Sequence, residues 1–173
     1  MKQKGIATVY IVIMAIVVIA VVGAGVYLSI GKGGTPPGGE GGGPSGGEVR
    51  TATSIQFTVE TKTDTGVDVT TFQVKDIGSS SMKIRAEGTV LGEEFKGILD
   101  GALQKMWRYS NGQWEDVSIL FPTFWGMFSQ QINTYLQYLA EWKGGTWTSP
   151  DGKITIRDIV VNPSLPDSLF QPG

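Results

Sequence analysis

Residues 121–142 read FPTFWGMFSQQINTYLQYLAEW, and this stretch decides the fold because it predicts a helix with a broad aromatic face. At 100° per residue, its large apolar side chains fall within an arc of roughly 120°. These side chains are Phe121, Phe124, Trp125, Phe128, Ile132, Tyr135, Leu136, Leu139 and Trp142. Pro122 suits a first helical turn, and Lys143 before Gly144 and Gly145 is a stop signal. So wide a face requires a large apolar surface to cover it.

The residue types in the chain exclude several classes of function. The 173 residues include neither cysteine nor histidine, so disulfides, thiol catalysis, a Ser-His-Asp triad and the usual zinc sites cannot form. Residues 48–173 carry 11 Lys and Arg against 15 Asp and Glu, with no basic cluster that could follow a phosphate backbone. We therefore expect no enzyme, no metal, no cofactor and no nucleic-acid partner.

The N-terminal region predicts a membrane anchor. Residues 6–30 form a run of 25 uncharged residues, rich in Ile, Val and Ala, which as a helix would be about 38 Å long and could cross a bilayer. Lys2 and Lys4 precede the run, so the N-terminus is expected in the cytoplasm and the following domain outside a single-pass cell-membrane span. Two alternatives stay open: a cleaved secretory signal with its exit near Ala24, and a leader cut after Gly5, since Lys4-Gly5 before Ile6 resembles archaeal prepilin signals.

A flexible linker is expected to follow the anchor. Residues 31–47 read GKGGTPPGGEGGGPSGG, in which ten of 17 residues are glycine and three are proline. Such a composition buries too little surface to offset chain entropy, and its full extension would be about 55 Å. The predicted organisation is therefore an anchor over 1–30, a linker over 31–47 and an extracytoplasmic domain over 48–173.

The rest of the domain is predicted to be strands. Apolar and polar residues alternate in segments that start near Ile55, Val67, Met82, Phe95, Lys105, Gln113, Thr146 and Lys153. Asn111-Gly112 is the strongest hairpin signal, and a change of phase near Thr70 suggests a β-bulge. We expect an α+β fold: a curved antiparallel half-barrel of about seven strands, with one amphipathic helix on its concave face.

Three stretches resemble a known family. Residues 82–88 (MKIRAEG), then Asp100-Gly101, then residues 106–110 (MWRYS) with Trp114, are similar in order and spacing to the core of the LolA/LppX-like lipoprotein-carrier superfamily. Residues 162–170 (NPSLPDSLF) resemble its closing segment. The resemblance implies an incompletely closed half-barrel that binds acyl chains or other lipids in an apolar hollow beneath its helices. A single helix, a shorter chain and a membrane span depart from the carriers, and together with the Gly-rich linker they resemble archaeal surface proteins.

Two interpretations of the aromatic residues follow: they form core only, or they also line a lipid-sized cavity. The predicted cavity residues are Trp107, Tyr109, Trp114, Phe121, Phe124, Trp125, Phe128, Ile132, Tyr135, Leu136 and Leu139. The charged side chains of Lys83, Arg85 and Glu87 alternate with apolar ones and are expected to form a solvated strand face. The leading hypothesis is a membrane-anchored lipid-binding or lipoprotein-binding protein, a carrier or a receptor. The rival is a structural or interaction subunit of a cell-surface assembly, resembling a pilin, with unknown protein partners.

Overall fold

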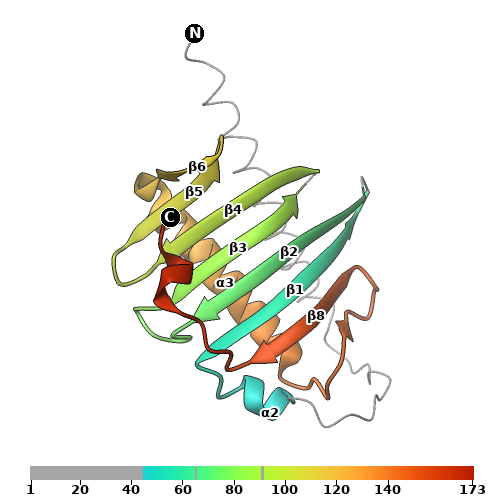
Figure 1. Ribbon diagram of the computed structural model, residues 1–173. Helices are drawn as coiled ribbons and strands as arrows, with labels where there is room; N and C mark the ends of the chain where they lie inside the picture. The colour runs from blue at the N-terminus through green and yellow to red at the C-terminus, as the bar shows by residue number, and fades with distance from the viewer. Residues whose placement is uncertain (1–44, 65, 91) are drawn as a thin grey trace.

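The computed structural model describes residues 45–64, 66–90 and 92–173, which form one eight-stranded antiparallel sheet and one long helix (Figure 1). The strands are β1 Ser54–Thr63, β2 Gly66–Lys75, β3 Lys83–Val90, β4 Glu93–Asp100, β5 Lys105–Ser110, β6 Gln113–Asp116, β7 Trp147–Thr148 and β8 Ile154–Val161. The helical elements are α2 Gly46–Val49, α3 Phe121–Leu139, and the 3-10 turns η1 Ser118–Leu120 and η2 Asp167–Phe170. The predicted antiparallel α+β class is confirmed, with eight strands where about seven were expected.

The sheet is open, and its order is β6-β5-β4-β3-β2-β1-β8-β7. The first six strands form a meander of hairpins, and β8 returns to pair with β1. Asn111 and Gly112 both have positive φ (52° and 82°), as the two-residue turn between β5 and β6 requires, so the predicted Asn-Gly hairpin is confirmed. None of the helices in the described ranges is long and apolar enough to cross a membrane, and the predicted span over residues 6–30 lies outside those ranges.

The β-bulge predicted near Thr70 is wrong. β2 pairs without interruption with both β1 and β3, and Asp68, Thr70, Phe72 and Val74 alternate as its buried positions. Val67, at the tip of the hairpin, is 52% exposed. The apolar Val67 and Val69 therefore gave the wrong phase, because they lie on the face opposite to Phe72.

The irregularity in the sheet lies instead between β1 and β8. The register shifts between Gln56 and Thr58, which leaves one extra residue on β8, where Asp158 has a φ of 55°. Before this bulge Ile154 and Ile156 are buried, and after it Ile159 and Val161 pack against the core. The bulge thus changes the phase of β8 at the point where its apolar pattern changes.

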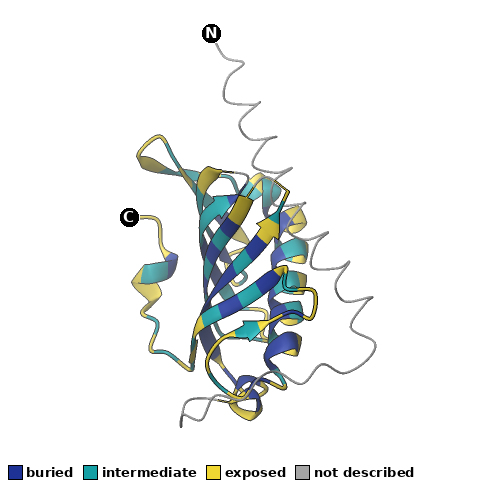
Figure 2. Cartoon of the chain, turned by 90° about the vertical axis from the view of Figure 1, so that its right-hand side faces the viewer, coloured by how far each residue is buried: buried dark blue, intermediate teal, exposed yellow. Residues whose placement is uncertain are grey.

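Helix α3 covers one face of the sheet, which we call the inner face (Figure 1, Figure 2). It begins at Phe121, with Pro122 in its first turn, and ends at Leu139, three residues before the predicted end. Its buried positions are Phe121, Phe124, Phe128, Ile132, Tyr135, Tyr138 and Leu139. Tyr138 was not predicted to face inward; its ring stacks on Trp147 of β7, with 4.8 Å between centroids. The buried arc is therefore rotated toward Tyr138, which leaves Trp125 and Leu136 only partly buried on the opposite border.

Aromatic rings meet where α3 crosses the centre of the sheet. Phe57 of β1 and Phe72 of β2 stack with 5.4 Å between centroids, and the ring of Tyr135 lies 5.6 Å from Phe57 and 5.8 Å from Phe72. Phe128 adds a ring 6.4 Å from Phe72. Ring pairs at these separations contribute beyond the area that they bury, so this cluster is the main link between helix and sheet.

The domain begins slightly before the predicted boundary at residue 48. Ser45 caps α2, and Gly46 is buried against the C-terminal end of α3, where its amide donates to the carbonyl of Trp142 at 2.6 Å. A Cβ on Gly46 would lie 2.3 Å from the carbonyl oxygen of Ala140, so this close approach requires glycine. Arg50 forms an ion pair with Glu141 at the same place. Residues 45–47, predicted as linker, therefore belong to the folded part.

Truncation of Ile132 should expose how much the fold depends on α3. This side chain is fully buried at 0% exposure, so Ile132→Ala should lower the free energy of unfolding by about 2–5 kcal/mol in urea titrations. Asn133→Ala changes the exposed neighbouring position and should alter it by less than about 0.5 kcal/mol. Equal effects of the two variants would contradict the packing described.

Two glycines should respond to alanine in opposite directions. A Cβ on Gly101 would lie 2.6 Å from both the Ser80 carbonyl oxygen and the Trp125 ring, whereas a Cβ on Gly126, in the exposed middle of α3, would meet nothing within 4 Å. Gly101→Ala should therefore lower the melting temperature. Gly126→Ala should raise the free energy of unfolding by about 0.5–1 kcal/mol, because alanine favours the helix. Thermal unfolding by circular dichroism checks both.

Candidate functional site

The sheet separates the predicted cavity residues into two groups. The eight on α3 belong to the inner face: Phe121, Phe124, Phe128, Ile132, Tyr135 and Leu139 are buried, and Trp125 and Leu136 pack partly buried against the same core. The other three lie on the opposite face, which we call the outer face: Trp107, Tyr109 and Trp114. A hollow beneath α3 therefore cannot be lined by all eleven.

The inner group lies on a surface made mostly of apolar strand residues, with Thr61, Asp68 and Thr70 as its buried polar positions. The apolar residues are Ile55, Phe57, Val59, Phe72, Val74, Ile84, Ala86, Leu99, Met106, Ile154 and Ile156, all buried. Their positions follow from the registers: Ile55, Val74, Ile84, Leu99 and Met106 are successive cross-strand partners from β1 to β5. An unbroken apolar row across five strands matches the apolar side of α3 and leaves few directional contacts between them.

Several polar side chains on α3 form hydrogen bonds within the helix. Ser129 Oγ donates to the carbonyl of Trp125, and Thr134 Oγ1 donates to that of Gln130. The buried Tyr135 hydroxyl accepts a hydrogen bond of 3.0 Å from Gln131 Nε2, one turn earlier on the same helix. Burial raises the pKa of Tyr135, so the phenol stays neutral in the core. These groups can move with the helix without losing their partners.

The ends of α3 differ in their attachment. At its start, η1 is held to β5 by Ser118, whose hydroxyl accepts from the Met106 amide at 3.1 Å and donates to Asp116 Oδ1 at 2.5 Å. These bonds to Ser118 hold the pKa of Asp116 down at about 2. After its end, Gly144 and Gly145 both have positive φ (104° and 72°). Glycine adopts these backbone angles at a lower energetic cost than any other residue.

The outer aromatic residues pair with cations. Trp107 lies opposite Ile98 in the β4–β5 ladder, which puts Met106 and Arg108 on the inner face. The ring of Tyr109 contacts that of Trp114 at 5.4 Å between centroids. Each ring also has a charged neighbour: Lys105 for Trp107 at 5.9 Å, Lys96 for Tyr109 at 5.5 Å and Arg85 for Trp114 at 5.9 Å. Counting alternation from Met106 would have given this placement.

A C-terminal segment covers part of the outer face; we call residues 163–171 the strap. Figure 2 shows it on the side of the sheet opposite to α3. η2 packs on β3 and β4, where Phe170 is 1% exposed and Ile98 is fully buried. Phe170 belongs to the segment 162–170 that resembles the closing segment of the carriers, but neither it nor Ile98 was among the predicted cavity residues.

Cations from neighbouring strands hold the strap. Lys75 and Lys83 contact Asp167 Oδ1 at 3.0 and 3.3 Å, and Lys75 also donates to the carbonyl of Leu165. Arg85 Nη1 donates to the carbonyl of Leu169 at 2.9 Å. Lys83 and Arg85, expected on a solvated face, are thus only partly exposed, because the strap lies across them.

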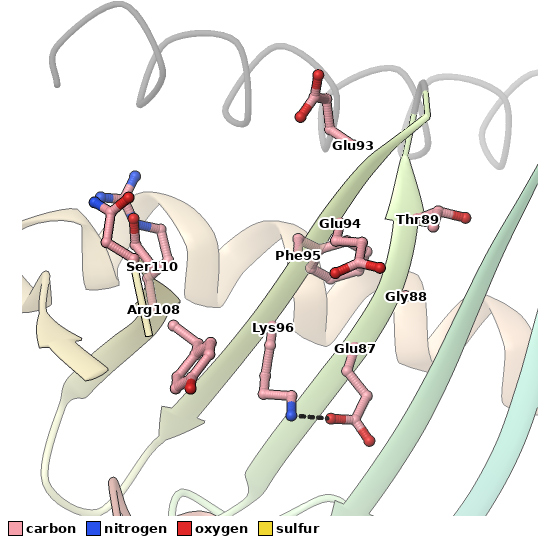
Figure 3. A pocket seen from close by; sticks show the side chains of 11 residues that line it. Glu87, Gly88, Thr89, Glu93, Glu94, Phe95, Lys96, Arg108 and Ser110 are labelled. Atoms are coloured by element: carbon pink, nitrogen blue, oxygen red, sulfur yellow. Dashed lines mark ion pairs between the residues drawn. The ribbon is translucent and has the colours of Figure 1, made fainter. Parts of the chain in front are cut away.

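A pocket of about 580 Å³ opens between β4 and the β5–β6 hairpin (Figure 3). Most of the residues that line it are polar or charged: Glu87, Gly88, Thr89, Glu93, Glu94, Phe95, Lys96, Arg108, Tyr109, Ser110 and Asn111. Of the predicted cavity residues it includes only Tyr109. The sequence did not indicate this pocket, because it depends on how two neighbouring strands diverge.

Comparisons with known proteins give no relative. No protein-family model, no curated protein and no solved structure matches the chain. The resemblance to lipoprotein carriers therefore stays a prediction. Among the residues that the structure describes, no group of three or more Asp and Glu side chains is placed to hold a metal ion.

The strap should loosen in acid. Hydrogen bonds from Lys75 and Lys83 lower the pKa of Asp167, so these contacts are complete above the ordinary aspartate pKa of about 4 and are lost as the pH falls through the lowered value. NMR signals of Leu169 and Phe170 should shift toward random-coil positions below about pH 4. Asp167→Asn should cause the same shift at pH 7, and Asp64→Asn, at an exposed turn, should not. Signals that stay unchanged in Asp167→Asn would contradict this role.

Proposed function

We propose that this chain is a membrane-anchored extracytoplasmic protein that holds an acyl or isoprenoid chain between its sheet and α3. The sheet would act as a half-barrel and α3 as its lid. One observation carries the proposal: α3 rests on an apolar surface through its aromatic face, while Ser129, Gln131 and Thr134 keep their side-chain hydrogen bonds within the helix.

In an apolar interface of this kind, a lipid chain can replace some of the contacts that α3 makes with the sheet. Dispersion and burial are non-directional, and each CH₂ group that leaves water contributes about 0.8 kcal/mol. A chain inserted along the row from Ile55 to Met106 would meet aliphatic side chains of the apolar core that α3 now covers. No catalytic step is involved, and release would reverse the insertion.

Entry of a lipid requires movement of α3, because Phe57, Phe72, Phe128 and Tyr135 now fill the centre of the interface. Gly144 and Gly145 offer a hinge at the C-terminal end of the helix. The helix can swing with its internal hydrogen bonds intact, so the free energy needed is that of separating apolar surfaces and of straining the bonds that hold its ends, from Met106 to Ser118 and from Gly46 to Trp142. A lipid chain that fills the space restores much of this contact.

The proposed anchor and linker place this domain close to its source of lipid. Residues 6–30 have the length and apolarity of a span, and the remaining linker, residues 31–44, limits the domain to about 50 Å from its end. Residence at a bilayer favours local handling of lipids over diffusion between membranes. A receptor or local carrier therefore fits better than a soluble shuttle.

Photo-crosslinking tests lipid binding directly. The full chain is reconstituted in phosphatidylcholine nanodiscs with a palmitic acid analogue that carries a terminal diazirine, irradiated, digested and analysed by mass spectrometry. We expect adducts on peptides from α3 and from β1–β2, near Phe57 and Phe72. Adducts confined to residues 1–44 or to the outer-face residues Trp107 and Trp114, or no adducts at all, would sink the proposal.

A pair of variants sharpens the result. Phe128→Leu leaves space beneath α3, and apolar cavities accept apolar ligands, so labelling of α3 should rise at least about twofold. Gln130→Leu adds an apolar group on the exposed side of the same helix and should leave labelling of the inner face unchanged. Equal increases in labelling for the two variants would indicate that the probe is attracted to any more apolar surface, and not to the space beneath α3.

A further inference from the structure

The sheet divides at the start of β4. β4 pairs with β3 over eight positions, from Glu93 to Asp100, but with β5 over only four, from Gly97 to Asp100. Among the described residues, 93–96 therefore have a strand neighbour on one side only. Beyond Arg108, β5 continues along β6 to Ser110, so the two strands part, and we call the space between them the split.

The split presents main-chain hydrogen-bonding groups to a potential partner strand. In an antiparallel ladder, successive residues direct their N–H and C=O groups alternately to the two sides. Every second residue of 93–96 thus points these groups away from β3 and into the split. The free stretch is about 13 Å long at 3.3 Å per residue, which matches an added strand of four residues. Such an edge is a template for pairing with another chain.

The pocket described above occupies this split, and Arg108 lies where the strands begin to part. Figure 3 shows Arg108 and Ser110 on one side and Phe95, Lys96 and Glu94 on the other. Arg108 Nη2 binds Glu115 at 2.6 Å, but its Nε is buried with no hydrogen-bond partner among the described residues. A buried donor without an acceptor is costly, so a movement of the Arg108 side chain that brought Nε to a carbonyl of an added chain would be favourable.

The charges around the split favour a basic partner. Lys96 is paired with Glu87 at 3.1 Å, and Arg108 is paired with Glu115. Glu93 and Glu94 are exposed and form no ion pair within the described ranges. The unpaired charge at the opening of the split, on Glu93 and Glu94, is therefore negative. It repels nucleic acid and attracts Lys and Arg side chains.

We propose that the split binds an extended, basic peptide segment of another protein, which adds to the free edge of β4 as a strand. Backbone pairing would provide most of the affinity, and Glu93 and Glu94 would select positive side chains. Arg108 and Phe95 lie on the inner face, but the split lies beyond the apolar row from Ile55 to Met106, so peptide binding and lipid binding can succeed or fail independently.

The test uses the full chain in neutral dodecyl maltoside and a rhodamine-labelled peptide, Lys-Val-Lys-Val-Lys, followed by fluorescence anisotropy. We expect saturable binding. A Glu-Val-Glu-Val-Glu peptide should bind at least about tenfold more weakly, and so should a copy of the basic peptide methylated at every main-chain nitrogen, because it cannot pair with an edge. Equal binding by the methylated copy, or no binding by the basic peptide, would overturn the proposal.

Variants locate the site. Reversing both charges at the opening of the split with Glu93→Lys and Glu94→Lys should weaken binding about tenfold, whereas Asp64→Lys, at the exposed β1–β2 turn, should leave it within twofold. A benzophenone-bearing version of the peptide should crosslink to residues 87–111. Crosslinks to the outer edges of the sheet at β6 or β7 would contradict the assignment.

Discussion

The packing of Phe128 and Tyr135 on Phe57 and Phe72 is the contact on which the rest of the structure depends. An open sheet of eight strands has one apolar face that water would otherwise cover, and no second sheet is present in the described ranges to bury it. α3 alone is a marginal helix in water, and the sheet alone would expose its inner row. Each stabilises the other by removing apolar surface from solvent. Because apolar contact is non-directional, α3 can be essential to the fold while its exact orientation on the sheet is only weakly fixed.

The two faces of the sheet are covered by different physical means. α3 covers the inner face through apolar contact, whereas the strap covers the outer face through one buried ring, Phe170, and through cations that bind its carbonyls and Asp167. Apolar contact tolerates sliding, but hydrogen bonds to Leu165 and Leu169 fix the strap in one register. The two faces thus differ in how firmly their covers are fixed, and the ligand entry that we propose lies on the side held by apolar contact.

The sequence predicts the helix and the antiparallel class because periodicity reports directly which side chains avoid water. It misplaces the phase of β2, since Val67 and Val69 are apolar yet lie near a hairpin tip where exposure costs little. The prediction also misplaces three rings, those of Trp107, Tyr109 and Trp114. Large rings suggest an interior position, but here they lie on the outer face, where cations and neighbouring rings contact them. The split cannot be read from residues 93–96 and 105–110, because each segment alternates like an ordinary strand and only their divergence creates the pocket.

The short helix α2 determines where mechanical load enters the domain. The chain preceding Ser45 reaches the fold at the C-terminal end of α3, where Gly46 binds Trp142 and Arg50 binds Glu141. Tension along that chain would first strain these few bonds, beside Gly144 and Gly145, before it reached β1 at Ser54. If the proposed membrane anchor is present, a pull from it would act first on the end of α3 that we propose as the hinge.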